Sequence, residues 1–163
     1  MRLSCGLSRA SVRAVREQVE RYSESFDTRL DRLCRELVEL GVEVAVTNVP
    51  VDTGDLKSSI RMEAHGDRSY LVVARNGHAA FVEFGTGVVG EGTYEGDLPP
   101  AWGYDERWTP EAHDKADPTI WYYRDPVDGE VHWTRGRKAA HYMLRASEAM
   151  RQQAIETARR VWR

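Results

Sequence analysis

The tripeptide Asp52-Thr53-Gly54 comes closest, among the segments of the chain, to a known catalytic motif. Aspartic proteases use Asp-Thr-Gly in pairs, because two carboxylates held close together cannot both ionise and therefore share one proton. A single copy would require a homodimer. Pro50 precedes the motif here, Asp55 adds a charge where a small residue is expected, and the segment is expected to join two helices instead of following a strand. A lone motif match is weak support, so we predict no catalytic residue and no enzyme activity.

The residue types that support metal binding or phosphate binding are scattered. No two histidines have the His-x-x-x-His spacing that places two ligands on one helix face; the five are His65, His78, His113, His132 and His141. Gly85-Thr86-Gly87 lacks the Lys-Ser/Thr that follows in a phosphate-binding loop. Cys5 and Cys34 are too few for a disulfide framework or a zinc site. No Ser-His-Asp or Cys-His arrangement stands out, although sequence order alone does not decide this. We predict neither a metal nor a cofactor.

The loop Thr134-Arg135-Gly136-Arg137-Lys138 is the best candidate for a nucleic-acid contact. Its basic residues Arg135, Arg137 and Lys138 could touch phosphates while Trp133 stacks on a base. A solvated basic loop is the plainer interpretation. A nucleic-acid-binding module that uses the basic C-terminal segment is therefore kept as an alternative function.

A long amphipathic helix is predicted over residues 8–47, because apolar residues recur there in steps of three and four. They are Val12, Val15, Val19, Tyr22, Phe26, Leu30, Leu33, Leu37, Leu40 and Val44. Unbroken, this helix would be roughly 55 Å long at 1.5 Å per residue. Either its N-terminal half projects toward a neighbour, or the helix breaks near Ser23-Glu24-Ser25 or Gly41. The stripe could be a coiled-coil seam, but core packing is the expected use.

Residues 50–87 are predicted to form the motif-bearing core. Pro50 ends the long helix, and Asp52 or Thr53 is expected to N-cap a short helix over about 54–59. Residues 60–64 alternate between apolar and polar, which predicts a half-buried strand. The continuous apolar run Tyr70–Ala74 predicts a strand covered on both faces.

The second half of this core turns twice. Asn76-Gly77 predicts a tight turn with positive φ at both central residues. Residues 79–84 are expected to form a third strand or a short turn leading into one, and Glu83 is expected to accept backbone hydrogen bonds near the glycine turn. Three glycines then allow the backbone to turn sharply or to pass close to another segment; they are Gly85, Gly87 and Gly90.

Residues 88–133 form an insert that contains four of the five tryptophans and five of the six prolines. The segments 119–124 and 131–134 predict a hairpin, and about 90–117 predicts an extended loop. This loop either packs on its own domain or orders against a partner, since Trp and Tyr suit interfaces. The possible interface residues are Trp102, Trp108, Trp121, Trp133, Arg135, Arg137 and Lys138. Residues 134–163 follow as the basic loop and a C-terminal helix over about 139–162.

The length of 163 residues fits a single domain, and hydrophobic (41%) and charged (30%) contents are those of a soluble globular protein. No apolar run approaches the roughly 20 residues that span a bilayer, and the start lacks the apolar region of a signal peptide. Residues 83–130 carry a net charge of −9 and residues 131–163 one of +6. Three interpretations stay open: solvated faces, an acidic middle that faces the basic end of another subunit, or an acidic surface that faces DNA without binding it.

Two motifs in a fixed order give the chain a family resemblance. The first is Pro-x-Asp-Thr-Gly-x-Leu-x-x-Ser-Ile after a long helix, and the second is Val-Glu-Phe-Gly-Thr after a hairpin; a helix that starts at Tyr142-Met143 with Ala146 closes the pattern. The chain resembles the neck, or tail-completion (head–tail joining), proteins of long-tailed bacteriophages over residues 10–87 and 134–160. The structural motif residues are Pro50, Asp52, Thr53, Gly54, Leu56, Ser59, Glu83, Phe84, Gly85 and Thr86. The departure from the pattern is the insert, where the family has a shorter loop.

The resemblance implies an α+β fold in which a long N-terminal helix and a C-terminal helix pack on a small antiparallel sheet. It implies a structural virion protein without catalytic residues, assembled in the host cytoplasm as a homo-oligomeric ring at the neck or tail end. The implied partners are further copies of the chain, the connector or adaptor, the tail-tube proteins and DNA that passes through the lumen without sequence-specific binding; no membrane is involved. Besides the nucleic-acid alternative, an enzyme built on Asp52 and a free monomeric adaptor are the rival functions.

Overall fold

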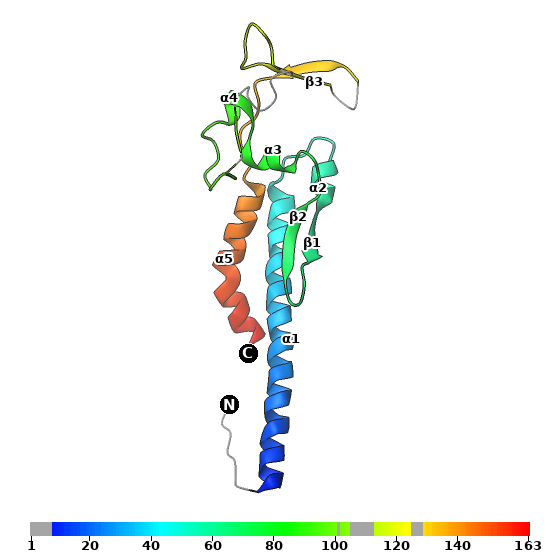
Figure 1. The fold of residues 1–163 in the computed structure, drawn as a ribbon, viewed down its shortest axis with the longest axis vertical. Coiled ribbons are helices and arrows are strands. Elements are labelled where there is room, and N and C mark those ends of the chain that lie inside the picture. Colours follow the sequence, from blue (N-terminus) through cyan, green and yellow to red (C-terminus); the bar gives the residue numbers. More distant parts are fainter. Residues whose placement is uncertain (1–7, 101, 105–112, 125–128) are drawn as a thin grey trace.

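Along the described residues, helices and short strands follow one another in pairs, and a long helix ends the series. The computed structural model describes residues 8–100, 102–104, 113–124 and 129–163. The helices are α1 (Arg9–Asn48), α2 (Asp55–Ser59), α3 (Ala79–Phe84), α4 (Gly87–Gly90) and α5 (Tyr142–Val161). The strands are β1 (Ile60–Ala64), β2 (Tyr70–Ala74), β3 (Trp121–Arg124) and β4 (Val131–Thr134), which form two separate two-stranded antiparallel sheets. The α+β class is confirmed (Figure 1).

The long helix α1 is continuous. Ser8 caps it, since the Ser8 hydroxyl accepts a hydrogen bond from the Ser11 N–H at 3.2 Å. It ends at Asn48, two residues before Pro50, as the backbone restriction before a proline predicts. At 1.5 Å per residue its 40 residues span roughly 60 Å. The predicted helix is therefore confirmed, and the alternative of a break inside it is wrong.

The C-terminal half of α1 lies between α5 and the β1–β2 hairpin (Figure 1). Gly41 permits the close approach, because a Cβ there would lie 2.7 Å from the Met150 sulfur on α5 and 2.9 Å from Val72 Cγ2 on β2. One cluster of buried hydrophobic residues forms the core, and it combines the end of α1 with β1, α3 and the start of α5. Its members are Ala45, Val49, Ile60, Val82, Tyr142 and Ala146. Burial of α1 thus begins well after its first turns.

The β1–β2 hairpin pairs Ile60 with Ala74 and Glu63 with Leu71. Arg75 donates to the Glu63 carboxylate at 2.6 Å, and this hydrogen bond is the main reason that the pKa of Glu63 falls to about 2. Leu71 is 43% exposed, beside this ion pair and on the face that α1 does not cover. The predicted strand at Tyr70–Ala74 is confirmed as β2, but the prediction that both faces of β2 are covered is wrong.

The segment that follows β2 differs from the sequence prediction. Asn76-Gly77 does turn the chain, but Gly77 has no positive φ; instead the Asn76 side chain accepts a hydrogen bond from the His78 N–H at 2.8 Å. The chain then enters α3, where the sequence predicts a third strand or a short turn leading into one, and that prediction is wrong. A helix buries the adjacent residues Val82 and Glu83 on one side, which the alternation of a strand would not do.

The described residues of the insert lie toward the end of the molecule opposite the start of α1 (Figure 1). Its strands β3 and β4 pair antiparallel with Trp121 opposite Thr134, which confirms the predicted hairpin. The helix α5 starts at Tyr142, three residues later than predicted, because the N–H groups of Arg137 and Ala140 bond to Thr86 and Val82 before the helix begins.

Candidate functional site

The Asp52-Thr53-Gly54 turn is a structural connection between α1 and α2. Gly54 is the N-cap residue of α2 and takes a left-handed conformation with φ of +89°. This reversal brings the Thr53 hydroxyl, and not the Asp52 carboxylate, to the helix start. The Thr53 oxygen accepts from the Asp55 N–H at 3.3 Å and the hydroxyl donates to the Asp55 carboxylate at 2.9 Å. The prediction that Asp52 or Thr53 is the N-cap residue is therefore wrong, and no hydrogen bond joins the Asp52 side chain to α2 among the described residues.

This geometry predicts opposite outcomes for two neighbouring substitutions. Thr53→Ala should lower the free energy of unfolding by about 0.5–1 kcal/mol, because it removes the only side-chain oxygen among the described residues that accepts a backbone N–H from the first turn of α2. Asp52→Ala should stay within about 0.5 kcal/mol of the parent chain. Urea unfolding of both variants checks this, and the reverse order would restore Asp52 as the cap.

The carboxylate of Glu83 is the centre of the second motif. Glu83 is 4% exposed, and its two oxygens accept from the N–H groups of Met143 and Leu144, each at 2.9 Å. These are the N2 and N3 positions of α5, whose N-cap residue His141 makes no side-chain cap. Glu83 therefore caps α5 from another part of the chain. It accepts backbone hydrogen bonds as predicted, but the donors lie at the start of α5 and not near the glycine turn.

Two tyrosines complete the surroundings of Glu83. The Tyr94 hydroxyl donates to Glu83 at 3.3 Å, and the Tyr142 hydroxyl donates to the Ala79 carbonyl at 3.1 Å. Burial first, and the charge of Glu83 second, raise the pKa of each tyrosine to about 12. Both phenols therefore stay protonated hydrogen-bond donors at neutral pH.

The glycine-rich exit of α3 interlocks with the basic loop, and we call residues 82–90 together with 134–144 the junction. Thr86 and Arg137 exchange two backbone hydrogen bonds of 2.9 and 3.0 Å. A Cβ on Gly85 would lie 2.8 Å from the Arg137 carbonyl oxygen, and one on Gly136 would overlap the Thr86 carbonyl. The predicted close passage of the glycines is confirmed, and the segment they pass is the basic loop.

The first part of the insert packs on α3. The Phe84 ring lies 4.9 Å from the Tyr94 ring and 5.0 Å from the Trp102 ring, measured between centroids. The Tyr104 hydroxyl donates to the Phe84 carbonyl at 2.8 Å. Of the two interpretations of this loop, packing on its own domain holds for Tyr94, Trp102 and Tyr104. Trp102 accordingly is part of this aromatic cluster.

The other predicted interface residues do not gather in one place. Trp121 stacks on His113 with 5.9 Å between centroids, whereas Trp133 is 61% exposed. Trp108 lies outside the described residues. Arg135 pairs with Asp117 at 3.0 Å and lies over the Trp133 ring, and the Arg137 and Lys138 side chains are exposed. Only these last two offer unneutralised charge, which weakens the nucleic-acid alternative.

The contacts of the two motifs and of the junction are those of a structural role. Within the part of the chain that the structure describes, no three His, Cys, Asp or Glu side chains are placed to hold a metal ion. No described helix is both long and apolar enough to cross a membrane. The two motifs shape turns and cap helices.

Residues 13–85 match the family model described as "Bacteriophage HK97-gp10, putative tail-component".

The HK97-gp10-like match runs from the first turns of α1 to Gly85, just after α3, and includes the first motif and all of the second except Thr86. It confirms the resemblance to phage neck and tail-completion proteins. The matched family is a structural component of the phage tail, and a tail component is part of the virion. No curated protein and no solved structure gives a significant match to the chain. The insert and α5 lie outside the matched residues.

Sequence reasoning missed the tertiary cap formed by Glu83, although one signal was present in the chain. The residue before α5 is His141, and no Ser, Thr, Asp or Asn stands within four residues before Tyr142. A long helix without a local cap needs an acceptor from elsewhere. A buried acidic residue in a motif of apolar and glycine neighbours is the natural source.

Proposed function

We propose that this protein is a structural virion protein that forms a homo-oligomeric ring at the neck or tail end, where it joins the head connector to the tail. The observation that carries the proposal is the match of residues 13–85 to a phage tail component. Asp52, Thr53, Gly54 and the junction then act as architecture, and the chain is not an enzyme. Its partners are further copies of itself, the connector or adaptor and the tail-tube proteins.

The charge distribution supports contacts between unlike faces of neighbouring copies. Glu91, Glu95 and Asp97 are exposed after α4, and no ion pair joins them to another described residue. Arg151 and Arg159 on α5, and Arg163 after its end, are also exposed, and no ion pair joins them to another described residue. Opposite charges on two faces favour head-to-tail association, and such contacts form a closed ring when the rotation between neighbours allows it.

A ring of this kind has to let DNA pass. Tight binding of phosphates would oppose passage, because every neutralised phosphate adds to affinity. Arg135, one of the three basic residues of the basic loop, is engaged by Asp117, and the net charge of the chain is −3. Both features support a lumen that holds DNA without sequence-specific binding.

Imaging tests the proposal directly. Negative-stain images and native mass spectra of the full chain, alone and mixed with connector and tail-tube proteins of the same phage, should show closed rings of one subunit number. Antibody labelling of intact virions should mark the joint between head and tail or the tail end. Labels confined to the capsid, or mixtures in which no ring forms, would overturn it.

A further inference from the structure

One face of the β3–β4 hairpin is aromatic and exposed. In the register of the two strands Tyr122 lies opposite Trp133, and Arg124 lies opposite Val131. Side chains alternate between the two faces of a strand, so these four residues share one face, which we call the platform. All four are exposed, and Trp133 is 61% exposed. Apolar residues that gather on a surface, unlike scattered single ones, indicate an interaction site.

Contacts within the chain hold the platform in place. The Tyr122 hydroxyl donates to the Asp114 carboxylate at 2.8 Å, and this hydrogen bond is the main reason that the pKa of Asp114 lies below its usual range. The Arg135 guanidinium lies over the Trp133 ring, 5.9 Å from its centroid, and pairs with Asp117. A surface that is already ordered loses less conformational entropy when a partner binds.

The charge of the platform favours an acidic partner. Arg124 is exposed, and no ion pair joins it to another described residue. Glu130 precedes Val131 and therefore belongs to the opposite face of the hairpin. The acidic neighbours are engaged, Asp117 by Arg135 and Asp114 by Tyr122. Trp, Tyr and Arg are also the residue types that contribute most of the binding energy at protein interfaces.

The chain carries a surface of matching chemistry in residues 91–100, which we call the strap. Pro99 and Pro100 at its end are exposed, and surfaces lined by aromatic residues bind proline-rich segments in several peptide-recognition domains. The acidic residues of the strap are exposed and match the charge of Arg124. They are Glu91, Glu95 and Asp97, none of which forms an ion pair with another described residue.

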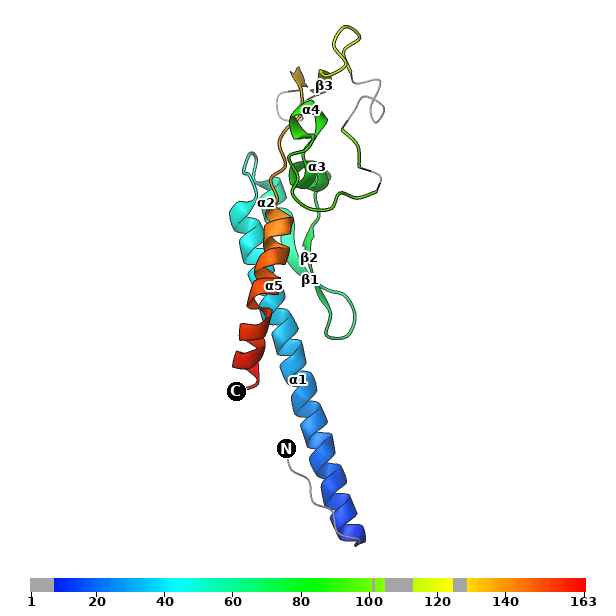
Figure 2. The same ribbon diagram turned by 90° about the vertical axis from the view of Figure 1, so that its left-hand side faces the viewer.

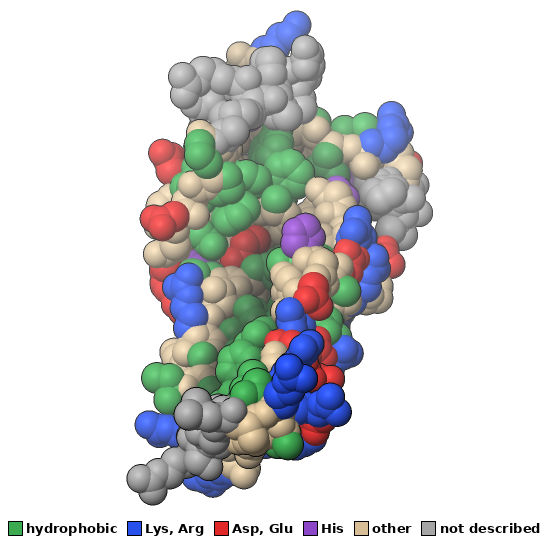
Figure 3. Space-filling view, turned by 60° about the horizontal axis from the view of Figure 1, so that its bottom comes forward, with side chains coloured by type: hydrophobic (Ala, Val, Ile, Leu, Met, Phe, Trp, Pro, Cys, Tyr) green, Lys and Arg blue, Asp and Glu red, His purple; other side chains and the backbone are tan. Residues whose placement is uncertain are grey.

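The platform and the strap lie toward the same end of the molecule but on different sides of it. In Figure 1 the hairpin points to the right and the strap curves to the left of α4, and Figure 2 also shows them apart. Figure 3 shows hydrophobic side chains gathered on this half of the molecule, with acidic ones along one border. Copies that stand side by side can therefore bring the platform of one to the strap of the next. The exposed arginines of α5 follow its C-terminal half, further from this end (Figure 1).

We propose that the platform of one copy binds the strap of a second copy, with Pro99 and Pro100 against Trp133 and Tyr122 and the acidic residues beside Arg124. The inference rests on the proposed self-assembly and names the two surfaces that meet. They are unlike faces, as a closed ring of identical copies requires. Both belong to the insert and lie outside residues 13–85, which match the phage family.

Two aromatic substitutions on opposite faces of the hairpin test the platform. Tyr123 is the matched control, because it lies opposite His132 on the other face and its ring stacks on that histidine at 5.8 Å between centroids. Each variant loses one cross-strand contact of the hairpin. In sedimentation equilibrium of the full chain, Trp133→Ala should weaken self-association by about tenfold or more, and Tyr123→Ala should leave it unchanged. Equal behaviour of the two variants, or a parent chain that stays monomeric at every concentration, would overturn the proposal.

Mixing two defective chains tests whether unlike faces meet. A strap variant with Glu95→Lys and Asp97→Lys should associate as weakly as Trp133→Ala. Each of these chains keeps one of the two surfaces intact, so an equal mixture should form dimers that contain one copy of each and nothing larger, as measured by native mass spectrometry. A strap variant that still associates alone, or a mixture that stays monomeric, would overturn the assignment. Binding of a single-stranded oligonucleotide that depends on Trp133, in chains that do not self-associate, would also overturn it.

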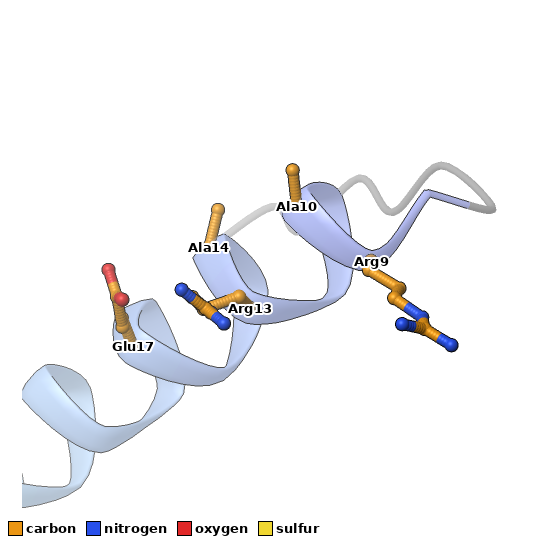
Figure 4. A pocket seen from close by; sticks show the side chains of 5 residues that line it. All are labelled: Arg9, Ala10, Arg13, Ala14 and Glu17. Carbon is orange, nitrogen blue, oxygen red and sulfur yellow. The ribbon is translucent and has the colours of Figure 1, made fainter.

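The other end of the molecule supplies the control for charge. Glu17 lines a hollow on the first turns of α1, together with Arg9, Ala10, Arg13 and Ala14 (Figure 4). Glu24 is exposed on the same helix. Glu17→Lys with Glu24→Lys makes the same change of charge as the strap variant and should associate like the parent. Rings that persist in Trp133→Ala would refute the contact and leave the ring proposal intact, whereas parent chains that associate through platform and strap without forming rings would do the reverse.

Discussion

Replacing Glu83 with alanine should lower the free energy of unfolding by about 3 kcal/mol. The carboxylate is buried and accepts from the N–H groups of Met143 and Leu144. A buried donor left without an acceptor costs about 1–3 kcal/mol, and the substitution leaves two such donors together with the Tyr94 hydroxyl. Loss of the negative charge at the start of α5 adds to the effect.

Two further variants separate capping from side-chain volume. Glu83→Gln keeps the shape but points an amide NH₂ group at one of the two N–H donors, so it should cost about half as much as alanine. Glu91→Ala, at an exposed acidic residue one helix away, should stay within about 0.5 kcal/mol of the parent. Denaturant unfolding at low protein concentration gives the energies, and hydrogen exchange at Met143 and Leu144 should report lost protection in the Glu83 variants only. Retained protection at these two amides would remove Glu83 from the cap.

Periodicity predicted the long elements because each is stabilised along its own length. The apolar series from Val12 to Val44 specifies α1, and the alternation from Ile60 to Ala64 specifies β1. The same approach failed at residues 79–84, where six mostly apolar residues fit either a strand or a helix. Their helical state depends on Val82 and Glu83 facing α5, and that contact joins residues about 60 positions apart.

The candidate site was predictable in its chemistry but not in its pairing. An acidic residue beside a glycine turn indicates an acceptor of backbone hydrogen bonds, and Glu83 is one. Its donors are invisible in the local sequence, because they belong to a helix that arrives after the insert. Asp52 shows the opposite case: residue type favours it as a cap, but the N-cap residue is Gly54 in a left-handed conformation, and the side-chain oxygen that accepts the Asp55 N–H belongs to Thr53.

Gly136→Ala should destabilise the protein by about 3 kcal/mol or more. Gly136 has a φ of +99°, which costs a residue with a Cβ about 1–2 kcal/mol. The new methyl group would in addition overlap the Thr86 carbonyl oxygen. That oxygen accepts the Arg137 N–H at 3.0 Å, so it cannot move away without breaking the pairing of the two segments. The clash is with backbone atoms, which cannot rotate out of the way as the end of a flexible side chain can.

Gly66→Ala is the matched control, since Gly66 has a φ of +93° and no described neighbouring atom lies within 4 Å of the position that a Cβ would take. It carries the same conformational cost without the clash, and should lose only about 1–2 kcal/mol. The difference between the two variants in thermal or urea unfolding therefore measures the interlocking of the junction. Equal losses would mean that the basic loop can separate from the glycine turn at little cost. The junction would then not be a rigid connection between α3 and α5, and Arg135 and Arg137 would be able to reach other partners.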